Sequence, residues 1–408
     1  MSVAPMDEVA PWLTIVGLPA AGVEALAPDA RAAIERAEWI AGSARQLALV
    51  RSIVHGEIFV WPSPLSAGMP SILARRGRAT CVLASGDPFF FGIGATLAPQ
   101  FRGEFVCHPA PSSLSLAAAK LGWPLQDCDV VSLHGRDLHD VIRYLQPGRR
   151  VFALAWDRTT PQLLAALLTE RGFARSRLHV LQMLGAPEER VRSCLAAEFA
   201  LGEVADLNLI AIEVAADRDA LIVPCRASVP DDAFEHDGQL TKQEIRALTL
   251  SALSPRAGET LWDIGAGAGS IAIEWMLCHP ANRAFAIERD PARCERIGRN
   301  ARRLGVPALA VVHASAPEGR DSLPMPDAIF IGGGSDRAIF ERSFRALRPG
   351  GRLVMNAVSL ETEAQLLESY AAHGGELRRF SIERADKLGS MTGWRSAMPV
   401  TQWKVVKT

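Results

Sequence analysis

The sequence predicts an α/β protein made of more than one domain. Short apolar segments alternate with stretches of helical periodicity throughout the 408 residues, and several of the apolar segments end in glycine-rich loops. This order is typical of parallel strands connected by helices. The length corresponds to two or three domains of ordinary size.

The composition is that of a globular protein without a membrane-spanning segment. Apolar residues make up 49% and charged residues 22% of the chain. The longest apolar runs, such as 207–216, are shorter than the roughly 20 residues that cross a bilayer. The 44 basic and 45 acidic residues nearly cancel, which argues against nucleic acid as a partner. We expect a cytoplasmic protein that contacts neither membrane nor nucleic acid.

Cysteine and histidine show no metal-binding pattern. The seven cysteines are an odd number without a CxxC pair, and the nine histidines form neither HExxH nor a cluster with carboxylates. We therefore expect free thiols in a reducing compartment and no metal site.

The first half contains two successive α/β lobes. Its predicted strands cover 12–18, 80–85, 104–108, 150–155, 178–183 and 206–214, and its predicted helices cover 29–40, 114–121 and 161–170. Gly86 and Asp87 follow the second strand, in a loop of the kind that binds ligands. Ser112 and Ser113 follow the third strand, where their hydroxyls either cap the next helix or contact a ligand.

Six short motifs give the first half a specific resemblance. They are Val16-Gly17, Ala84–Pro88, Pro111–Ser113, His134–Arg136, Asp157–Pro161 and Asp206–Asn208. In order and spacing they resemble the tetrapyrrole methylase family, so we expect its fold over 1–215, with lobes of about 1–115 and 116–215. The resemblance implies S-adenosylmethionine between the lobes, contacted by Gly86, Asp87, Ser112 and Ser113. The first loop departs from the family, whose loop is usually richer in glycine than Gly17–Gly22 of this chain, and Pro19 fixes its own backbone angle and removes a donor.

A turn-rich segment over 216–238 is the predicted linker to a second domain, 239–408. Thr241 and Glu244 have capping-box spacing at the start of a helix. The seven strands expected after it cover 259–264, 283–287, 309–313, 327–331, 352–357, 378–384 and 400–406. This order is that of a class I methyltransferase, a Rossmann-like fold whose last strand runs antiparallel.

The loop after the first of these strands carries Asp263 followed by alternate glycines at 265, 267 and 269. A dinucleotide fingerprint needs its third glycine or alanine at 270, where this chain has Ser270. Asp263 favours a cationic ligand over a pyrophosphate, which indicates S-adenosylmethionine. An ordinary turn is the alternative interpretation.

Two acidic residues follow the second strand of this domain. Glu288 stands 23 positions past Gly265, where a carboxylate can accept hydrogen bonds from ribose hydroxyls. Asp290 precedes Pro291 and is the predicted N-cap of a helix. The arginines of that helix, from 293 to 303, are interpreted as a solvated face.

Further motifs connect the second domain to a known family. They are Thr241-Lys242, Asp263–Gly269, Glu288, Ala316–Glu318 and Pro326–Gly334. They resemble the decarboxylating cobalt-precorrin carbon-15 methyltransferases. Nearly the whole chain therefore resembles the fused precorrin methyltransferases of cobalamin biosynthesis. The cofactor contacts expected in this domain are Thr241, Asp263, Gly265, Gly267, Gly269, Glu288, Ser315 and Ala316.

The resemblance implies methylation of precorrin-6Y at carbons 5 and 15 with loss of the ring-C acetate carboxylate, giving precorrin-8x. A polycarboxylate substrate should meet cations, and the candidates are Lys242, Arg246, Lys387 and Arg395. Glycines at 332–334 supply no aromatic platform for a nucleobase. No acid, base or nucleophile is predicted, because the tetrapyrrole itself supplies the reacting carbon.

Two other interpretations stay open on the sequence. One is a small-molecule or RNA methyltransferase with a non-catalytic N-terminal module, and the other is a tetrapyrrole carrier whose glycine loops are only turns. By analogy with relatives of both halves, we expect a homo-oligomer.

Overall fold

The computed structural model describes residues 11–225, 228–314, 323–332 and 337–408. These residues form two compact units. Unit 1 holds the described residues up to Gly135 together with Pro147–Ala220, and unit 2 holds Arg136–Gln146 together with the described residues from Leu221 onward. Among the described residues, no helix has the length and apolar character needed to cross a membrane.

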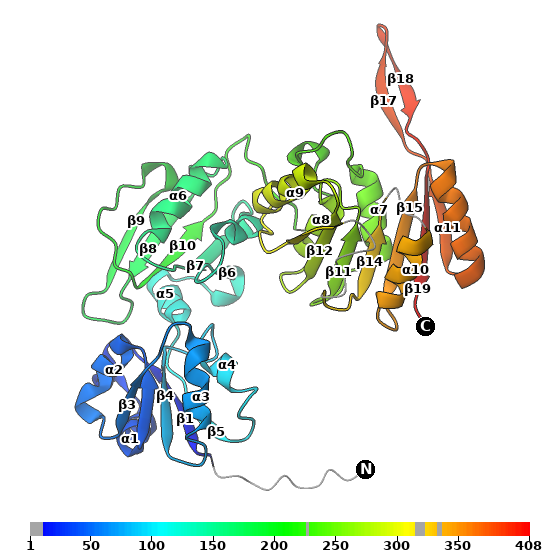
Figure 1. The fold of residues 1–408 in the computed structure, drawn as a ribbon. Helices are drawn as coiled ribbons and strands as arrows, with labels where there is room; N and C mark the ends of the chain where they lie inside the picture. Colours follow the sequence, from blue (N-terminus) through cyan, green and yellow to red (C-terminus); the bar gives the residue numbers. More distant parts are fainter. Residues whose placement is uncertain (1–10, 226–227, 315–322, 333–336) are drawn as a thin grey trace. The chain divides into compact units, whose positions relative to one another are not determined.

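The first sheet of unit 1 is entirely parallel, with strand order β3-β2-β4-β1-β5 (Figure 1). Its strands are β1 (Leu13–Leu18), β2 (Trp39–Gly42), β3 (Glu57–Val60), β4 (Thr80–Ser85) and β5 (Phe105–His108). Its helices are α1 (Pro28–Arg36), α2 (Ala44–Val50), α3 (Met69–Leu73) and α4 (Gly94–Leu97). Parallel strands are buried on both faces, and β4 is buried from Thr80 to Ala84.

One helix of this lobe is shorter than the sequence predicts. The pattern extends a helix over 29–40, but α1 ends at Arg36 and Ala37 is extended. Trp39–Gly42 instead forms a buried strand between β3 and β4. Hydrogen bonds from β2 to β3 and to β4 override the local helical periodicity, and the sequence of β2 alone cannot reveal these partners because they lie elsewhere in the chain.

The second sheet of unit 1 has strand order β6-β7-β10-β8-β9 and is mostly antiparallel. Only β6 and β7 run parallel. Its strands are β6 (Cys128–Ser132), β7 (Arg150–Leu154), β8 (Arg177–Gln182), β9 (Arg190–Leu195) and β10 (Asn208–Glu213). Helices α5 (Ser113–Leu121) and α6 (Thr160–Glu170) belong to this lobe. Sequence periodicity predicts three of the strands and misses β6 and β9.

Unit 2 contains the seven-stranded sheet that the sequence predicts, with order β13-β12-β11-β14-β15-β19-β16. The strands are β11 (Thr260–Ile264), β12 (Arg283–Glu288), β13 (Ala310–His313), β14 (Ala328–Ile331), β15 (Arg352–Ala357), β16 (Glu376–Phe380) and β19 (Val400–Val406). The helices are α7 (Gln243–Leu253), α8 (Ser270–Cys278), α9 (Pro291–Arg303), α10 (Arg337–Ala346) and α11 (Leu360–His373). Only β19 is antiparallel to its neighbours, which confirms the expected direction of the last strand.

The core of this sheet comes from its central strands. Trp262, Ile329 and Leu353 are nearly inaccessible to solvent, and Trp403 of β19 is fully buried among them. On the other face, α8 is buried along almost its entire length. The helix after the glycine loop is therefore an internal element, which holds the loop rigidly at one end of the sheet.

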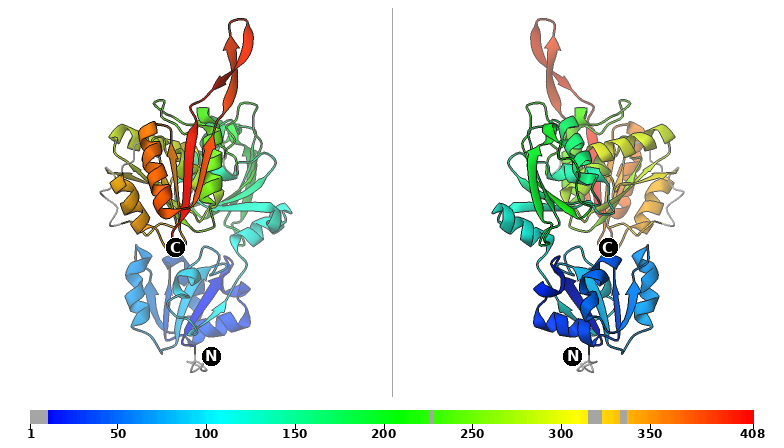
Figure 2. Two further views of the ribbon diagram at one scale, coloured as in Figure 1. Left: turned by 90° about the vertical axis from the view of Figure 1, so that its right-hand side faces the viewer. Right: turned by 90° about the vertical axis from the view of Figure 1, so that its left-hand side faces the viewer.

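A two-stranded arm was not predicted. Where the sequence indicates a loop before the last strand, β17 (Glu383–Leu388) pairs antiparallel with β18 (Met391–Ser396). The predicted strand over 378–384 is also wrong in extent, because β16 ends at Phe380 and the arm begins at Glu383. The arm projects beyond the seven-stranded sheet (Figure 2). Nearly all of its residues are exposed, so no alternating pattern marks it in the sequence.

The segment interpreted as a linker is packed against unit 2. Val223, Val229 and Phe234 are almost fully buried there. Contacts divide the chain after Ala220 and assign Arg136–Gln146 to unit 2, whereas the predicted boundaries lie at 215 and 239. Arg143 in this inserted segment donates to the carbonyls of Met276 and Leu277 at the end of α8.

Candidate functional site

The glycine loop of unit 2 lies at the carboxyl end of β11. Gly265, Gly267 and Gly269 have φ angles of 71°, 59° and 76°, a region that side chains rarely adopt. A Cβ added at Gly269 would lie 2.8 Å from Cγ2 of Ile297. The strand order reverses around β11, which is hydrogen-bonded to β12 and β14. Ligands of open α/β sheets bind at such a reversal.

Asp263 places a buried carboxyl group beneath this loop. It is 1% exposed, and its Oδ2 accepts a hydrogen bond of 3.1 Å from the Ala272 amide. Within the described residues, its Oδ1 has no hydrogen-bond partner. Burial raises the pKa of Asp263 to about 7, the Ala272 amide opposes this rise, and the charge of Glu288 adds to it. Such a group is stabilised by a cation, in agreement with the ligand class that the sequence indicates.

Glu288 holds the loop from the neighbouring strand. Its carboxylate is 3% exposed, and Oε2 accepts from the Gly267 amide at 2.9 Å. Oε1 accepts from the amides of Arg289 and Asp290 at 2.9 and 3.1 Å. Oε1 already accepts two hydrogen bonds, whereas Oε2 keeps a second lone pair for a ligand hydroxyl. The ribose contact expected for Glu288 therefore stays compatible with its role in ordering the loop.

Two helix-cap predictions differ in outcome. Asp290 is the N-cap of α9 and accepts from the amides of Ala292 and Arg293 at 2.8 and 3.2 Å, which confirms its predicted role. The prediction that Thr241 and Glu244 form a capping box is wrong. Helix α7 starts after Lys242 without a side-chain cap. Glu244 pairs instead with Arg384 at the base of the arm, because a charged partner is available there.

Asn300 is a site residue that the sequence analysis missed. It is fully buried in α9, and its Nδ2 donates to the carbonyl of Ala268 at 2.9 Å and to that of Glu235 at 3.0 Å. Its Oδ1 accepts from the Glu235 amide at 2.9 Å. One amide group thus connects the glycine loop to the segment before α7. A polar residue within an arginine-rich helix gives no local signal of this contact.

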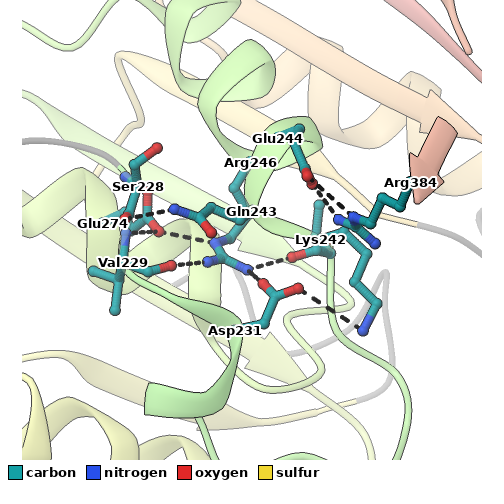
Figure 3. Close-up of polar contacts among 10 residues, drawn as sticks. Ser228, Val229, Asp231, Lys242, Gln243, Glu244, Arg246, Glu274 and Arg384 are labelled. Atoms are coloured by element: carbon teal, nitrogen blue, oxygen red, sulfur yellow. Dashed lines mark hydrogen bonds and ion pairs between the residues drawn. The ribbon is translucent and has the colours of Figure 1, made fainter. Parts of the chain in front are cut away.

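The structure corrects the expectation that Arg246 binds substrate. Its side chain is 0% exposed and lies between Glu274 at 2.8 Å and Asp231 at 2.6 Å (Figure 3). Its guanidinium also donates to the carbonyl of Thr241 at 2.6 Å and to that of Val229. No surface of Arg246 is left for a substrate carboxylate. The hydrophobic periodicity of α7 turns this position toward the interior.

This buried group, which we call the Arg246 cluster, comprises Arg246, Glu274 and Asp231. Glu274 of α8 accepts from the backbone amides of Ser228 and Val229 at 2.8 and 3.0 Å. Arg246 stacks on the ring of Phe234, with its guanidinium carbon 4.8 Å from the ring centre. The cluster therefore connects the chain before α7 to the helix that follows the glycine loop.

The other predicted cations lie in different places. Lys242 is half-exposed next to Thr241, with its ammonium 3.9 Å from the Asp231 carboxylate. Lys387 and Arg395 stand on the arm, and Arg395 pairs with Asp386 at 3.1 Å. The structure does not bring these two residues to the glycine loop of the same chain, because the hairpin projects outward. Ser315 and Ala316 lie outside the described residues.

The arginines of α9 are not only a solvated face. Arg293 and Arg296 pair with Asp237 at 2.9 and 3.1 Å, and Arg299 pairs with Glu235 at 2.9 Å. These acids come from the segment before α7. The periodicity of α9 alone could not predict these ion pairs, because their acidic partners come from a different segment of the chain.

The candidate site of unit 1 relies on close backbone contacts. Gly86 follows β4 with φ of 60°, and its amide donates to the carbonyl of Leu18 at 2.9 Å. Its carbonyl accepts from Ala110 at 3.3 Å. A Cβ at Gly17 would lie 2.0 Å from the Gly86 oxygen. The ends of β1, β4 and β5 therefore meet at one edge of the sheet.

The remaining candidates of unit 1 surround this contact. Asp87 is half-buried, and its Oδ1 accepts from the Phe89 amide at 2.8 Å. Ser112 caps α5 by accepting from the Ser115 amide at 3.1 Å, and Ser113 is the first residue of the helix. Of the two interpretations of these serines, capping is therefore observed for Ser112. Contact with a cofactor stays a prediction for all four candidates.

The acceptor groups present suit S-adenosylmethionine at the glycine loop of unit 2. Asp263 offers an unpaired buried oxygen, Glu288 offers acceptor capacity, and Gly265 is exposed at the loop. Among the described residues, no group of three or more His, Cys, Asp or Glu side chains is arranged around a metal ion.

This strand order, with a glycine loop at the reversal and an acidic residue ending the next strand, defines the class I methyltransferases. Residues 232–407 match the family model "Precorrin methyltransferase domain". Residues 12–200 match "Tetrapyrrole (Corrin/Porphyrin) Methylases". The fold class predicted for both halves is confirmed.

The chain belongs to the precorrin-6Y C(5,15)-methyltransferase (decarboxylating) family. It is 53% identical to a member from Sinorhizobium sp over 98% of this chain and 97% of the relative. It is 42% identical to a member from Mycobacterium tuberculosis over 97% of this chain and 100% of that relative. The cobalt-precorrin-7 C(5)-methyltransferase of Salmonella typhimurium is 32% identical and matches 48% of this chain over 98% of its own length.

Proposed function

We infer that the chain transfers methyl groups from S-adenosylmethionine to carbons 5 and 15 of precorrin-6Y and removes the ring-C acetate carboxylate, giving precorrin-8x. The observation that carries this function is the 53% identity across nearly the full length of both chains. It makes the chain a decarboxylating methyltransferase of cobalamin biosynthesis.

We propose that each half performs one methylation. Unit 1 would act on carbon 5 and unit 2 on carbon 15, with carbon dioxide released in unit 2. A relative named for carbon-5 methylation alone matches only 48% of this chain, which supports a division of the two activities. The tetrapyrrole methylase match over residues 12–200 supports the choice of unit 1 for carbon 5.

In unit 2, Thr241, the three loop glycines and Glu288 would hold S-adenosylmethionine, with Asp263 near its positive charge. When bound, this cofactor supplies an electrophilic methyl group on a sulfonium. The glycine backbone permits close approach of the ligand, and the carboxyl groups of Asp263 and Glu288 are themselves shielded from water. Holding donor and acceptor in line contributes up to about 7–11 kcal/mol to such a transfer. We assign no general acid or base to the protein.

In unit 1, Gly86, Asp87, Ser112 and Ser113 would contact the cofactor. Here the chain offers backbone groups at the meeting point of three strand ends rather than buried carboxylates. Lys242, half-exposed beside Thr241, is the remaining candidate in unit 2 for binding a substrate carboxylate.

We propose that the enzyme is a homo-oligomer assembled through the arm. Leu388, Met391 and Trp394 of the arm are 66%, 68% and 76% exposed. An isolated two-stranded hairpin is only marginally stable in water. The register places Leu388 and Met391 on one face of the arm and Trp394 on the other, so large exposed apolar side chains on both faces mark it as an interaction surface. Sedimentation of W394S should show smaller particles than wild type. Activity in the cytoplasm, without nucleic acid, stays a prediction.

Mass spectrometry of precorrin-6Y incubated with the full chain and S-adenosylmethionine tests the proposed reaction. We expect a product with two added methyl groups and one lost carboxylate, together with released carbon dioxide. A tetrapyrrole of unchanged mass would favour the carrier interpretation. Calorimetry should find two S-adenosylmethionine sites per chain, and a single site would favour a non-catalytic first half.

A further inference from the structure

Arg45 stands at the ligand-binding edge of the first sheet of unit 1. It is the second residue of α2, immediately past the carboxyl end of β2, and it is exposed. Its Nη2 donates to the hydroxyl of Ser85 at 3.0 Å. Ser85 is the last residue of β4 and precedes Gly86. The guanidinium therefore lies directly beside the loop that we assign to the cofactor in unit 1.

The orientation of Arg45 is supported by its neighbours. Ser43 and Gln46 form a capping box at the start of α2, which fixes the backbone on either side of Arg45. The side-chain Nε2 of Gln46 donates to the same Ser85 hydroxyl at 3.1 Å. The Ser85 hydroxyl is neutral, so it accepts a hydrogen bond from the guanidinium without compensating its charge.

Within the described residues, Arg45 has no carboxylate partner. Other arginines of the same lobe are paired, such as Arg75 with Glu57 at 2.7 Å and Arg78 with Glu38 at 2.9 Å. Although Arg45 is exposed as a residue, neighbouring protein atoms partly desolvate its guanidinium and lower its pKa. A partly desolvated cation without a counter-charge gains from binding an anion, and a guanidinium matches a carboxylate with two parallel hydrogen bonds.

Exposed aromatic side chains lie on the loop after the same strand. Phe89, Phe90 and Phe91 are 46%, 38% and 54% exposed. Phe91 has a φ angle of 52°, a strained conformation for a bulky residue. Three apolar rings and one unpaired cation at the same edge suit a large apolar ring system with carboxylates on its periphery.

We propose that Arg45 binds a side-chain carboxylate of the tetrapyrrole in the active site of unit 1. This inference rests on the proposed function and names a substrate-binding residue for it. The carboxylate positions the macrocycle, while the methyl donor is held by the neighbouring loop. Arg45 then contributes to methylation of carbon 5 and not to the reaction in unit 2.

The test compares R45Q and R45K with the wild-type full chain, using precorrin-6Y as substrate. We expect R45Q to raise the KM for precorrin-6Y in carbon-5 methylation by about 10- to 100-fold, because the charge-assisted contact between the guanidinium and the carboxylate is lost, with a smaller change in kcat. R45K keeps the charge but loses the paired geometry, so its KM should lie between the two. R31Q removes an equal charge from α1 of the same lobe and should leave KM unchanged.

Two outcomes would overturn the inference. One is a KM for R45Q within about twofold of wild type. The other is a loss of S-adenosylmethionine affinity or of melting temperature in both R45Q and R45K that accounts for the whole change, since a structural role would produce it. If the wild-type chain methylates neither carbon, the proposed function fails. If the wild-type chain is active and R45Q is equally active, only the inference on Arg45 fails.

Discussion

The two glycine loops to which we assign S-adenosylmethionine are built in different ways. In unit 2, three glycines with positive φ are surrounded by the buried carboxyl groups of Asp263 and Glu288. In unit 1, Gly86 is packed against backbone atoms, with the Gly17 Cα so close that a Cβ would meet the Gly86 oxygen at 2.0 Å. The loop of unit 2 is surrounded by buried charge, whereas the loop of unit 1 depends on close approach of the backbone.

The difference teaches which substitutions each site tolerates. A charge change should affect unit 2, because burial makes every uncompensated charge costly there. A small increase in volume should affect unit 1, because backbone atoms cannot move aside as a flexible side chain can. Four predictions test this contrast, and each should act on one unit and leave the other unchanged.

R246M should have the largest effect. Removing one member of a buried ion pair leaves Glu274 uncompensated, which costs about 3–5 kcal/mol. We expect the calorimetric unfolding transition of unit 2 to fall, together with its S-adenosylmethionine affinity, while the site in unit 1 is retained. The double variant R246M/E274M should regain part of the loss. Wild-type stability in R246M would show that the cluster does not hold the loop.

D263N should change the pH dependence of unit 2. Because the folded protein raises the pKa of Asp263 from 3.8 to about 7, it binds this proton more tightly than the unfolded chain. The stabilisation is complete below about pH 4 and is lost as the pH rises to about 7. D263N cannot ionise, so its stability relative to wild type should increase over this range, by at most about 4 kcal/mol.

Calorimetry without added cofactor, at several pH values, measures this difference. Asp232 is an exposed carboxylate of the same unit, so D232N should stay within about 0.5 kcal/mol of wild type. With cofactor present, D263N should weaken binding at only one of the two sites. A stability difference between D263N and wild type that does not depend on pH would contradict the role of burial.

G17A tests the close approach in unit 1. The added Cβ would lie 2.0 Å from the Gly86 oxygen and 2.7 Å from the Ala110 nitrogen, so the backbone must shift at a cost of about 3 kcal/mol. Carbon-5 methylation should be lost while carbon dioxide release continues. G298A is the matched control, because a Cβ at Gly298 of α9 meets nothing within 4 Å. Full carbon-5 methylation in G17A would remove the contrast between the loops.

R384A should have the smallest effect. The pair of Arg384 with Glu244 joins the arm to α7, and both side chains are nearly half exposed. Exposed ion pairs contribute at most about 1 kcal/mol. Unfolding of unit 2 should therefore change little, while hydrogen exchange in the arm increases. If R384A lost as much stability as R246M, exposure to solvent would not explain the difference between the Arg384–Glu244 and Arg246–Glu274 ion pairs.

Much of the fold follows from local patterns. The strands that lead into both loops, β4 and β11, are apolar runs ending at glycine, and their extents agree with prediction within one residue. Spacing alone identifies the positive-φ glycines and the Asp290 cap. The pattern fails at β2, which resembles a helix, and in the arm, where the exposed strands have no periodicity.

The chemical class of the site was therefore present in the sequence, since glycines and acidic residues at strand ends act through nearby backbone. Tertiary structure decided what depends on distant partners. It enclosed Arg246 between Glu274 and Asp231, joined Asn300 to Ala268, and left Arg45 without a carboxylate within the described residues. Whether a charged side chain binds substrate or stabilises the fold depends on which partners the fold brings within hydrogen-bond distance, and no single segment encodes that.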